Sequence, residues 1–205
     1  MAKQQWKPGN MVYPLPAVMV SCADKQGHQN VMTAAWTGTI CSDPAMVYIS
    51  VRKERFSHHM LMETKEYVIN LTTEALARAT DYVGVKSGRD MNKFEAMHLT
   101  PVMGTLQYAP MIEESPVCIE CEVTQVIELG SHDMFIAKVK HVFADEKYMD
   151  ETGRFDLSKA KPLVYSHGQY YGVGRRIGRF GFSVQKKPVK KAVRTKRTGS
   201  GTKQA

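Results

Sequence analysis

PVCIECEVTQVIEL (residues 116–129) and DMFIAKVKHVFADEKY (residues 133–148) are the two runs that decide the fold. In the first run, Val117, Ile119, Cys121 and Val123 alternate with Cys118, Glu120, Glu122 and Thr124, and this period of two is typical of a β-strand. The second run alternates in the same way, and only the tripeptide GSH separates the two. The pair therefore predicts a long antiparallel hairpin.

Shorter runs rich in Val, Ile, Thr and Tyr predict four more strands, over residues 11–22, 30–41, 45–51 and 67–71. The linker ADKQGHQ joins the first two as a hairpin, since Gly27 can adopt a positive φ. About seven strands, without a repeated unit of strand and long helix, predict a mainly β fold. A closed or nearly closed antiparallel barrel is the architecture that this pattern favours.

Helical signals are short. SHHMLMETKE predicts one short helix with Ser57 as its N-cap, and a second helix is expected over residues 73–82. VKSGRDMNKFEAMHLT (85–100) is polar and rich in turn residues, so it predicts an ordered loop with one helical turn.

The charge of the chain is concentrated at its end. The 205 residues carry a net charge of +8, but eight Lys and Arg and no acid lie from residue 186 onward, leaving 20 basic and 20 acidic residues before it. This pattern predicts a folded domain over residues 1–185 and a disordered basic tail over 186–205. No run approaches the roughly 18 apolar residues of a membrane span, and no signal-peptide core is present, so we expect a cytoplasmic protein without a membrane partner.

Several apparent motifs have simpler interpretations. Cys118 and Cys121 form a CxxC, but a strand places them on opposite faces, which favours two unpaired cysteines over a redox or zinc motif. His58 and His59 diverge on a helix, so we expect no metal site. The glycines in GVGRRIG have the wrong spacing for a dinucleotide fingerprint.

The block NVMTAAWTGTICSDPAMVYISVRKER (30–55) has the composition of a ligand site. Its small residues would let a flat ligand approach the backbone, while hydroxyl groups and amides supply hydrogen bonds. Arg52 and Arg55 stand at a strand exit, just before a helix whose first N–H groups have no internal partner, and this combination favours a bound phosphate. The alternative is that both arginines are solvated surface charges.

Three segments, TAAWTGTICSDPAMVYISVRKERFSHHML, SGRDMNKFE and YSHGQYYGVG, together resemble the flavin reductase-like family of FMN-binding split barrels, and specifically its flavoredoxin-type branch. The resemblance covers roughly residues 8–180. It implies a six-stranded antiparallel Greek-key split barrel, a homodimer, and FMN held near the dimer interface.

The resemblance also implies roles for individual residues. It places along the isoalloxazine ring Thr33, Ala34, Ala35, Trp36 and Thr37. Beside the ring and the ribityl chain it places Ser50, Val51 and Arg52, and near the phosphate Arg55, Ser57 and His58. Lys93 and His167 match positions where the family closes over the flavin or its partner. Because the flavin itself carries the chemistry, no catalytic protein residue is expected.

The implied function is an FMN-dependent oxidoreductase that reduces an acceptor with electrons from NAD(P)H or from a protein donor. Two alternatives within the fold are a flavoredoxin-like carrier without NAD(P)H activity and a protein that releases FMN as a product. A different class is a nucleic-acid-binding protein that acts through its basic tail. That tail lacks interleaved aromatic residues and the rest of the chain is neutral, which disfavours nucleic acid as a partner.

Overall fold

The computed structural model describes residues 1–185 and divides the chain into two units. The first unit, residues 1–173, holds every sheet of the described chain. The second unit begins at Gly174 and contains, in its described part, the short 3₁₀ helix η4 (Phe182–Val184). The segment 186–205, expected to be a disordered basic tail, lies outside the described residues.

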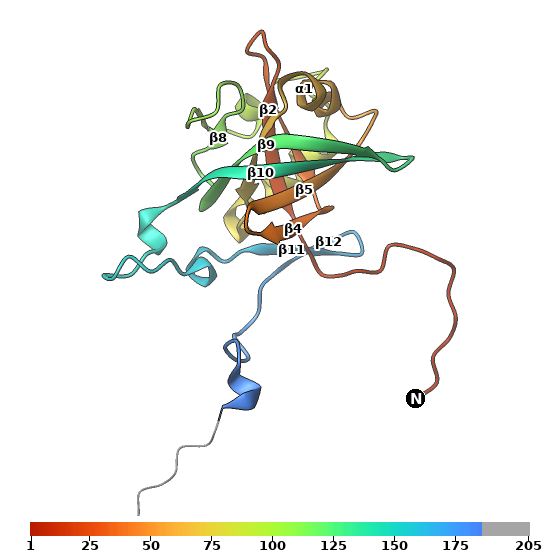
Figure 1. Ribbon diagram of the computed structural model, residues 1–205, viewed down its shortest axis with the longest axis vertical. Helices are drawn as coiled ribbons and strands as arrows, with labels where there is room; N and C mark the ends of the chain where they lie inside the picture. Colours follow the sequence, from red (N-terminus) through yellow and green to blue (C-terminus); the bar gives the residue numbers. More distant parts are fainter. Residues whose placement is uncertain (186–205) are drawn as a thin grey trace, which may run out of the picture. The chain divides into compact units, whose positions relative to one another are not determined.

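One antiparallel sheet of seven strands dominates the first unit (Figure 1), in the order β3-β2-β6-β9-β10-β5-β4. Its strands are β2 (Val18–Ala23), β3 (Gln29–Ala34), β4 (Thr37–Ser42), β5 (Ala45–Arg52), β6 (Glu66–Leu71), β9 (Val117–Glu128) and β10 (His132–Ala144). Two small sheets accompany it, one of β1 (Leu15–Pro16), β11 (Leu163–Ser166) and β12 (Gln169–Gly172), the other of β7 (Pro101–Val102) and β8 (Met111–Ile112).

The large sheet curls into a barrel because its two edges are consecutive in the chain. β3 and β4 are the edge strands, and only Ala35 and Trp36 separate them. Three Cα-to-Cα steps cover at most about 11 Å, so the end of one edge must lie close to the start of the other. The prediction of a mainly β, nearly closed antiparallel barrel is confirmed.

The prediction of a single strand over residues 30–41 is wrong, because the structure has two strands there. The chain bends at Ala35 and Trp36 because β3 pairs with β2 whereas β4 pairs with β5. The carbonyl of Trp36 accepts a hydrogen bond from Ser50 N at 2.8 Å, which fixes the bend against β5. The sheet therefore has seven strands where six were expected. The predicted strand 11–22 likewise divides, since β1 pairs with β11 and only β2 joins the barrel.

The two predicted hairpins are confirmed. β9 and β10 pair along their whole length and lie side by side in Figure 1, with Glu128 opposite Asp133 at the turn. Two register shifts interrupt this pairing, as β-bulges do in long curved strands. β2 and β3 form the other hairpin, and Gly27 adopts a φ of 89° in its turn.

The helices are α1 (Phe56–Thr64), α2 (Ala77–Val85) and α3 (Lys93–Ala96), with short 3₁₀ turns η1 (Glu74–Leu76), η2 (Glu146–Tyr148) and η3 (Leu157–Ala160). α3 is the helical turn expected within 85–100. The N-cap predicted at Ser57 is wrong: the cap position is Arg55, and the Ser57 hydroxyl is buried, where it accepts from Asn30 Nδ2 at 2.8 Å. No helix in the described chain is long and apolar enough to cross a membrane.

The main core fills the barrel and is closed by α1. Tyr67, Phe135, Ile49, Met60 and Leu61 are fully buried there. Cys121 packs in this core, whereas Cys118 packs with Val68 and Ala109 on the other side of the strand, and both thiols are free. The predicted placement of the two cysteines on opposite faces is confirmed.

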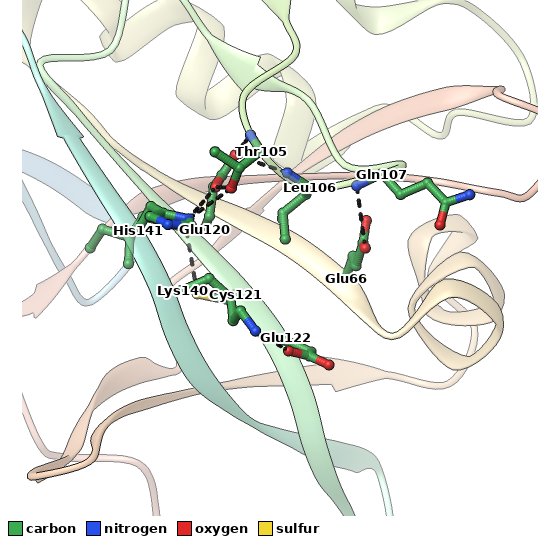
Figure 2. A network of polar contacts seen from close by, with 10 residues as sticks. Glu66, Thr105, Leu106, Gln107, Glu120, Cys121, Glu122, Lys140 and His141 are labelled. Atoms are coloured by element: carbon green, nitrogen blue, oxygen red, sulfur yellow. Dashed lines mark hydrogen bonds and ion pairs between the residues drawn. The ribbon is translucent and has the colours of Figure 1, made fainter.

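A loop between β7 and β8 is held on the outside of the barrel by two strand carboxylates (Figure 2). Glu120 of β9 accepts from the backbone N–H groups of Thr105 and Leu106 at 2.7 and 3.4 Å and from the Thr105 hydroxyl. Glu66 of β6 accepts from Tyr108 N at 2.8 Å. The loop also passes so close that a Cβ on Gly104 would clash with Glu120 Oε1. The carboxylates therefore replace the backbone partners that this irregular segment lacks.

Candidate functional site

A cavity of about 300 Å³ opens at the corner where β3 turns into β4. It lies within the size range of small-molecule sites. Its walls come from the β3 end, the corner itself, the β5 end, α2, the start of β10 and the β11–β12 turn. The lining residues are Ala17, Met32, Thr33, Ala34, Ala35, Trp36, Ser50, Val51, Arg52, Arg55, Asp81, Gly84, Val85, His132, Tyr165, Gly168 and Tyr170.

The corner gives this cavity a wall of small side chains and one aromatic ring. Ala34 and Ala35 leave the backbone uncovered, so a planar ligand can approach it closely. Trp36 stays 39% exposed and packs against His132 of β10, with ring centroids 5.8 Å apart. Thr33 donates its hydroxyl hydrogen bond to the Thr80 carbonyl of α2, which ties the helix to the corner. The wall is thus fixed in place without filling the cavity.

A second cavity of about 440 Å³ adjoins the first and is strongly basic. The two share Met32, Arg52, Arg55 and Val85 as lining residues. The second is also lined by Asn30, Glu54, Phe56, Ser57, Lys86, Ser87, Gly88, Arg89 and Lys93. Five cations against one carboxylate make this cavity suited to an anion.

The N-terminus of α1 reinforces this positive charge. Arg55, at the cap position, has an extended backbone, no side chain caps the helix, and its first turn contains no acid. The first N–H groups of the helix therefore keep their hydrogen-bonding capacity, and the helix dipole favours an anion beside them. Arg55 is held by a hydrogen bond from its Nη1 to the Gly84 carbonyl at 2.7 Å.

Lys93 fixes the far wall of the basic cavity. Its ammonium is buried and donates to the carbonyls of Val83 at 2.9 Å and Lys86 at 3.2 Å, at the C-terminus of α2. Burial lowers the pKa of Lys93 to about 8, so the group remains mostly protonated at neutral pH. A cation at a helix C-terminus is favourable, and here it also anchors the loop that follows α2.

The structure brings ten of the thirteen predicted site residues to these two cavities. The first is lined by Thr33, Ala34, Ala35, Trp36, Ser50, Val51, Arg52 and Arg55, and the second also by Ser57 and Lys93. Thr37 is buried and donates to the Tyr48 carbonyl at 2.7 Å, and His58 pairs with Asp133 at 2.8 Å. His167 packs against Tyr13 in a tilted arrangement with ring centroids 4.4 Å apart, next to the lining residue Gly168.

Several lining residues were missed by the sequence analysis. Asp81, His132, Tyr165 and Tyr170 line the first cavity, and Lys86 and Arg89 the second. Only weak sequence signals could have identified these residues. His132 occupies the hairpin turn at the start of β10, and Tyr165 and Tyr170 flank the His167–Gly168 turn. Nothing in the sequence alone brings these segments to the corner.

The chemistry of the paired cavities follows from their linings. One offers exposed backbone and aromatic faces to a planar ring, and the other offers cations and helix amides to an anionic group. No cluster of three His, Cys, Asp or Glu suited to a metal ion occurs among residues 1–185. The arrangement fits a flat heterocycle that carries a phosphate.

Comparisons with known proteins agree with this geometry. Residues 11–174 match the family described as flavin reductase like domain. The flavoredoxin of Desulfovibrio vulgaris (Miyazaki F) has a TM-score of 0.83 and 30% identity, covering 90% of this chain and 100% of that one. The flavoredoxin from Methanosarcina acetivorans has a TM-score of 0.82 and 25% identity over the same shares. An FMN-binding protein from Thermus thermophilus with bound 1-cyclohex-2-enone has a TM-score of 0.69 and 25% identity, covering 84% and 94%. This chain therefore belongs to the flavin reductase-like family, in its flavoredoxin-type branch.

Proposed function

We propose that the protein is an FMN-binding oxidoreductase that passes electrons from a reduced donor to an acceptor. The observation that carries this proposal is the pairing of the two cavities, one flat-walled and one basic, which share Arg52 and Arg55. The similar proteins support it, since two of them are flavoredoxins and a third is named as FMN-binding.

Different residues of this chain would hold the ring and the phosphate of the cofactor. Ala34, Ala35 and Trp36 would lie along the isoalloxazine ring, and the α1 amides, Arg55 and Lys93 would hold the phosphate. Bound flavin supplies hydride and electron transfer. The protein orients the ring, limits access to it and sets its electrostatic surroundings. No side-chain nucleophile is required for this function.

The electron donor is either NAD(P)H or a protein, and one experiment separates them. An absorption spectrum of the purified protein is expected to show oxidised flavin, identified as FMN by mass after release. Anaerobic NADH or NADPH should bleach the flavin bands if the protein is a reductase. Persistence of the bands, with rapid reduction by a protein donor, would favour the carrier. Absence of flavin even after incubation with FMN would contradict the proposal.

We also propose that the protein forms a homodimer. The edge strand β4 supports this proposal, because it presents the apolar side chain of Ile40, 48% exposed, four residues along the chain from the exposed Trp36 at the corner. An edge strand can pair with another chain, and exposed apolar residues gathered on it favour such an interface. Sedimentation equilibrium should give twice the 23.1 kDa mass of the chain. A monomer at micromolar concentration would contradict it.

Arg52→Ala is expected to weaken FMN binding by about 1 to 3 kcal/mol, because the guanidinium lines both cavities and can make a charged hydrogen bond to the cofactor. Titration of the apoprotein with FMN, followed by flavin fluorescence, measures this change. Arg154→Ala is the matched control. That exposed arginine lines neither cavity, so its removal should leave the affinity unchanged. Equal FMN affinities of the wild type and Arg52→Ala would exclude a charged hydrogen bond from Arg52 to the cofactor.

A further inference from the structure

The first cavity carries opposite charges in different parts. Arg52 and Arg55 belong to the part that it shares with the basic cavity. Asp81, Tyr165 and Tyr170 line only the first cavity. α2 presents Asp81 on the same face as Gly84 and Val85, since these positions are three and four residues apart. The part not needed for an anionic cofactor is therefore aromatic and has a carboxylate.

The two tyrosines are held rigidly. They face each other across the β11–β12 hairpin, with ring centroids 5.7 Å apart in an edge arrangement. The hairpin turn has positive φ angles of 49° at His167 and 79° at Gly168, as a tight two-residue turn requires. Tyr13 packs against both Tyr165 and His167, which ties the hairpin to the N-terminal segment. Pre-positioned aromatic side chains lose little entropy when a ligand binds them.

The phenol of Tyr170 is a hydrogen-bond donor at every physiological pH. Partial burial, together with the nearby Asp81 carboxylate, raises its pKa to about 12. Asp81 itself is exposed at the cavity wall, where it places its carboxylate beside the tyrosines. A ring that enters here meets two aromatic faces, one hydroxyl donor and one anion.

We infer that Asp81 and Tyr170 form the subsite for the small molecule that exchanges electrons with the flavin, and that they select planar rings that are neutral or cationic against anionic ones. This inference rests on the proposed function. Aromatic faces favour a planar or cationic ring, the Tyr170 hydroxyl binds a ring oxygen, and the Asp81 carboxylate repels a negatively charged substituent. Both side chains act on specificity and orientation, and the electron transfer belongs to the flavin.

Two matched probes test this selection, 1,4-naphthoquinone and its 2-sulfonate. The FMN-loaded protein is reduced anaerobically and mixed with each quinone, and the rate of flavin reoxidation is followed against quinone concentration. The wild type should saturate at a lower concentration of the neutral quinone. Asp81→Asn should reduce this preference about three- to tenfold, because it removes the charge that repels the sulfonate. The preference is the ratio of the two half-saturating concentrations, and intrinsic differences between the quinones cancel when this ratio is compared between variants. Glu151→Gln, which removes an exposed carboxylate outside the cavity, should leave the ratio unchanged.

Tyr170→Phe provides an independent second variant. It keeps the aromatic face and removes the donor, so half-saturation by the neutral quinone should rise about three- to tenfold with little change in the limiting rate. An unchanged preference in Asp81→Asn, or unchanged half-saturation in Tyr170→Phe, would overturn the inference. A loss of FMN affinity in either variant would also overturn it, by placing these residues against the cofactor. Failure of the wild type to bind FMN would instead refute the proposed function.

Discussion

Gly88→Ala is expected to lower the affinity for FMN about 10- to 100-fold. A Cβ at this position would clash with Asn30 Oδ1 and would lie 2.7 Å from Phe56 Cδ1, closer than real Cβ atoms approach other heavy atoms. Both neighbours lie at the start of α1, because Phe56 is its first residue and Asn30 of β3 donates to the hydroxyl of Ser57, its second. Strain of this kind costs about 1 to 3 kcal/mol, and it is relieved by moving the loop after α2 away from the helix N-terminus. The basic cavity would thereby widen.

The measurement is a fluorescence titration of the apoprotein with FMN, alongside a thermal unfolding curve without the cofactor. Gly9→Ala is the control, because its Cβ would meet only the Lys7 carbonyl, at 3.9 Å. Arg89→Ala tests the same wall without strain, since its side chain lines the cavity and packs over Phe56 at 5.6 Å. Undiminished FMN affinity in both Gly88→Ala and Arg89→Ala would show that this loop takes no part in binding.

The strands were predictable where their signal is local. The run 45–51 and the hairpin of β9 and β10 alternate with a period of two, the run 67–71 is rich in β-branched and aromatic residues, and the structure has strands at all of them. The bend at Ala35 and Trp36 was not predictable, because both residues are compatible with a strand. Only the different partners of β3 and β4 impose the bend, since β3 pairs with the preceding strand β2 and β4 with the following strand β5.

The residues of the candidate site also fall into a part that was predictable from local sequence and a part that was not. The block 30–55 supplies most of the wall of the first cavity, and its small residues and paired arginines are visible in one stretch of sequence. Asp81, His132, Tyr165 and Tyr170 reach the cavity from four other elements, so only the closed barrel brings them there. The misplaced N-cap has a similar cause. Ser57 follows the rule for a cap, but a residue 27 positions earlier in the chain, Asn30, occupies its hydroxyl.

Glu120→Ala is expected to lower the free energy of unfolding by about 2 to 4 kcal/mol. The carboxylate is fully buried and accepts from Thr105, Leu106 and His141, as Figure 2 shows. Its removal leaves these donors without their acceptor and a gap beside Gly104. Urea denaturation followed by circular dichroism measures the change. Glu122→Ala is the control two residues along β9, where the pair with Lys140 is exposed to solvent and its loss should change the stability little.

The pH dependence of this effect identifies the charge as its source. Burial alone would raise the pKa of Glu120, but hydrogen bonds from Thr105, Leu106 and His141 outweigh it and lower the pKa below its ordinary value. A lowered pKa in the folded state means that the stabilisation is complete above the unfolded value of about 4.3 and is lost as the pH falls through the folded value. The difference in stability between the wild type and Glu120→Gln should therefore shrink as the pH falls below about 4. A difference that stays constant down to pH 3 would mean that packing alone, without the ionised carboxylate, holds the loop in place.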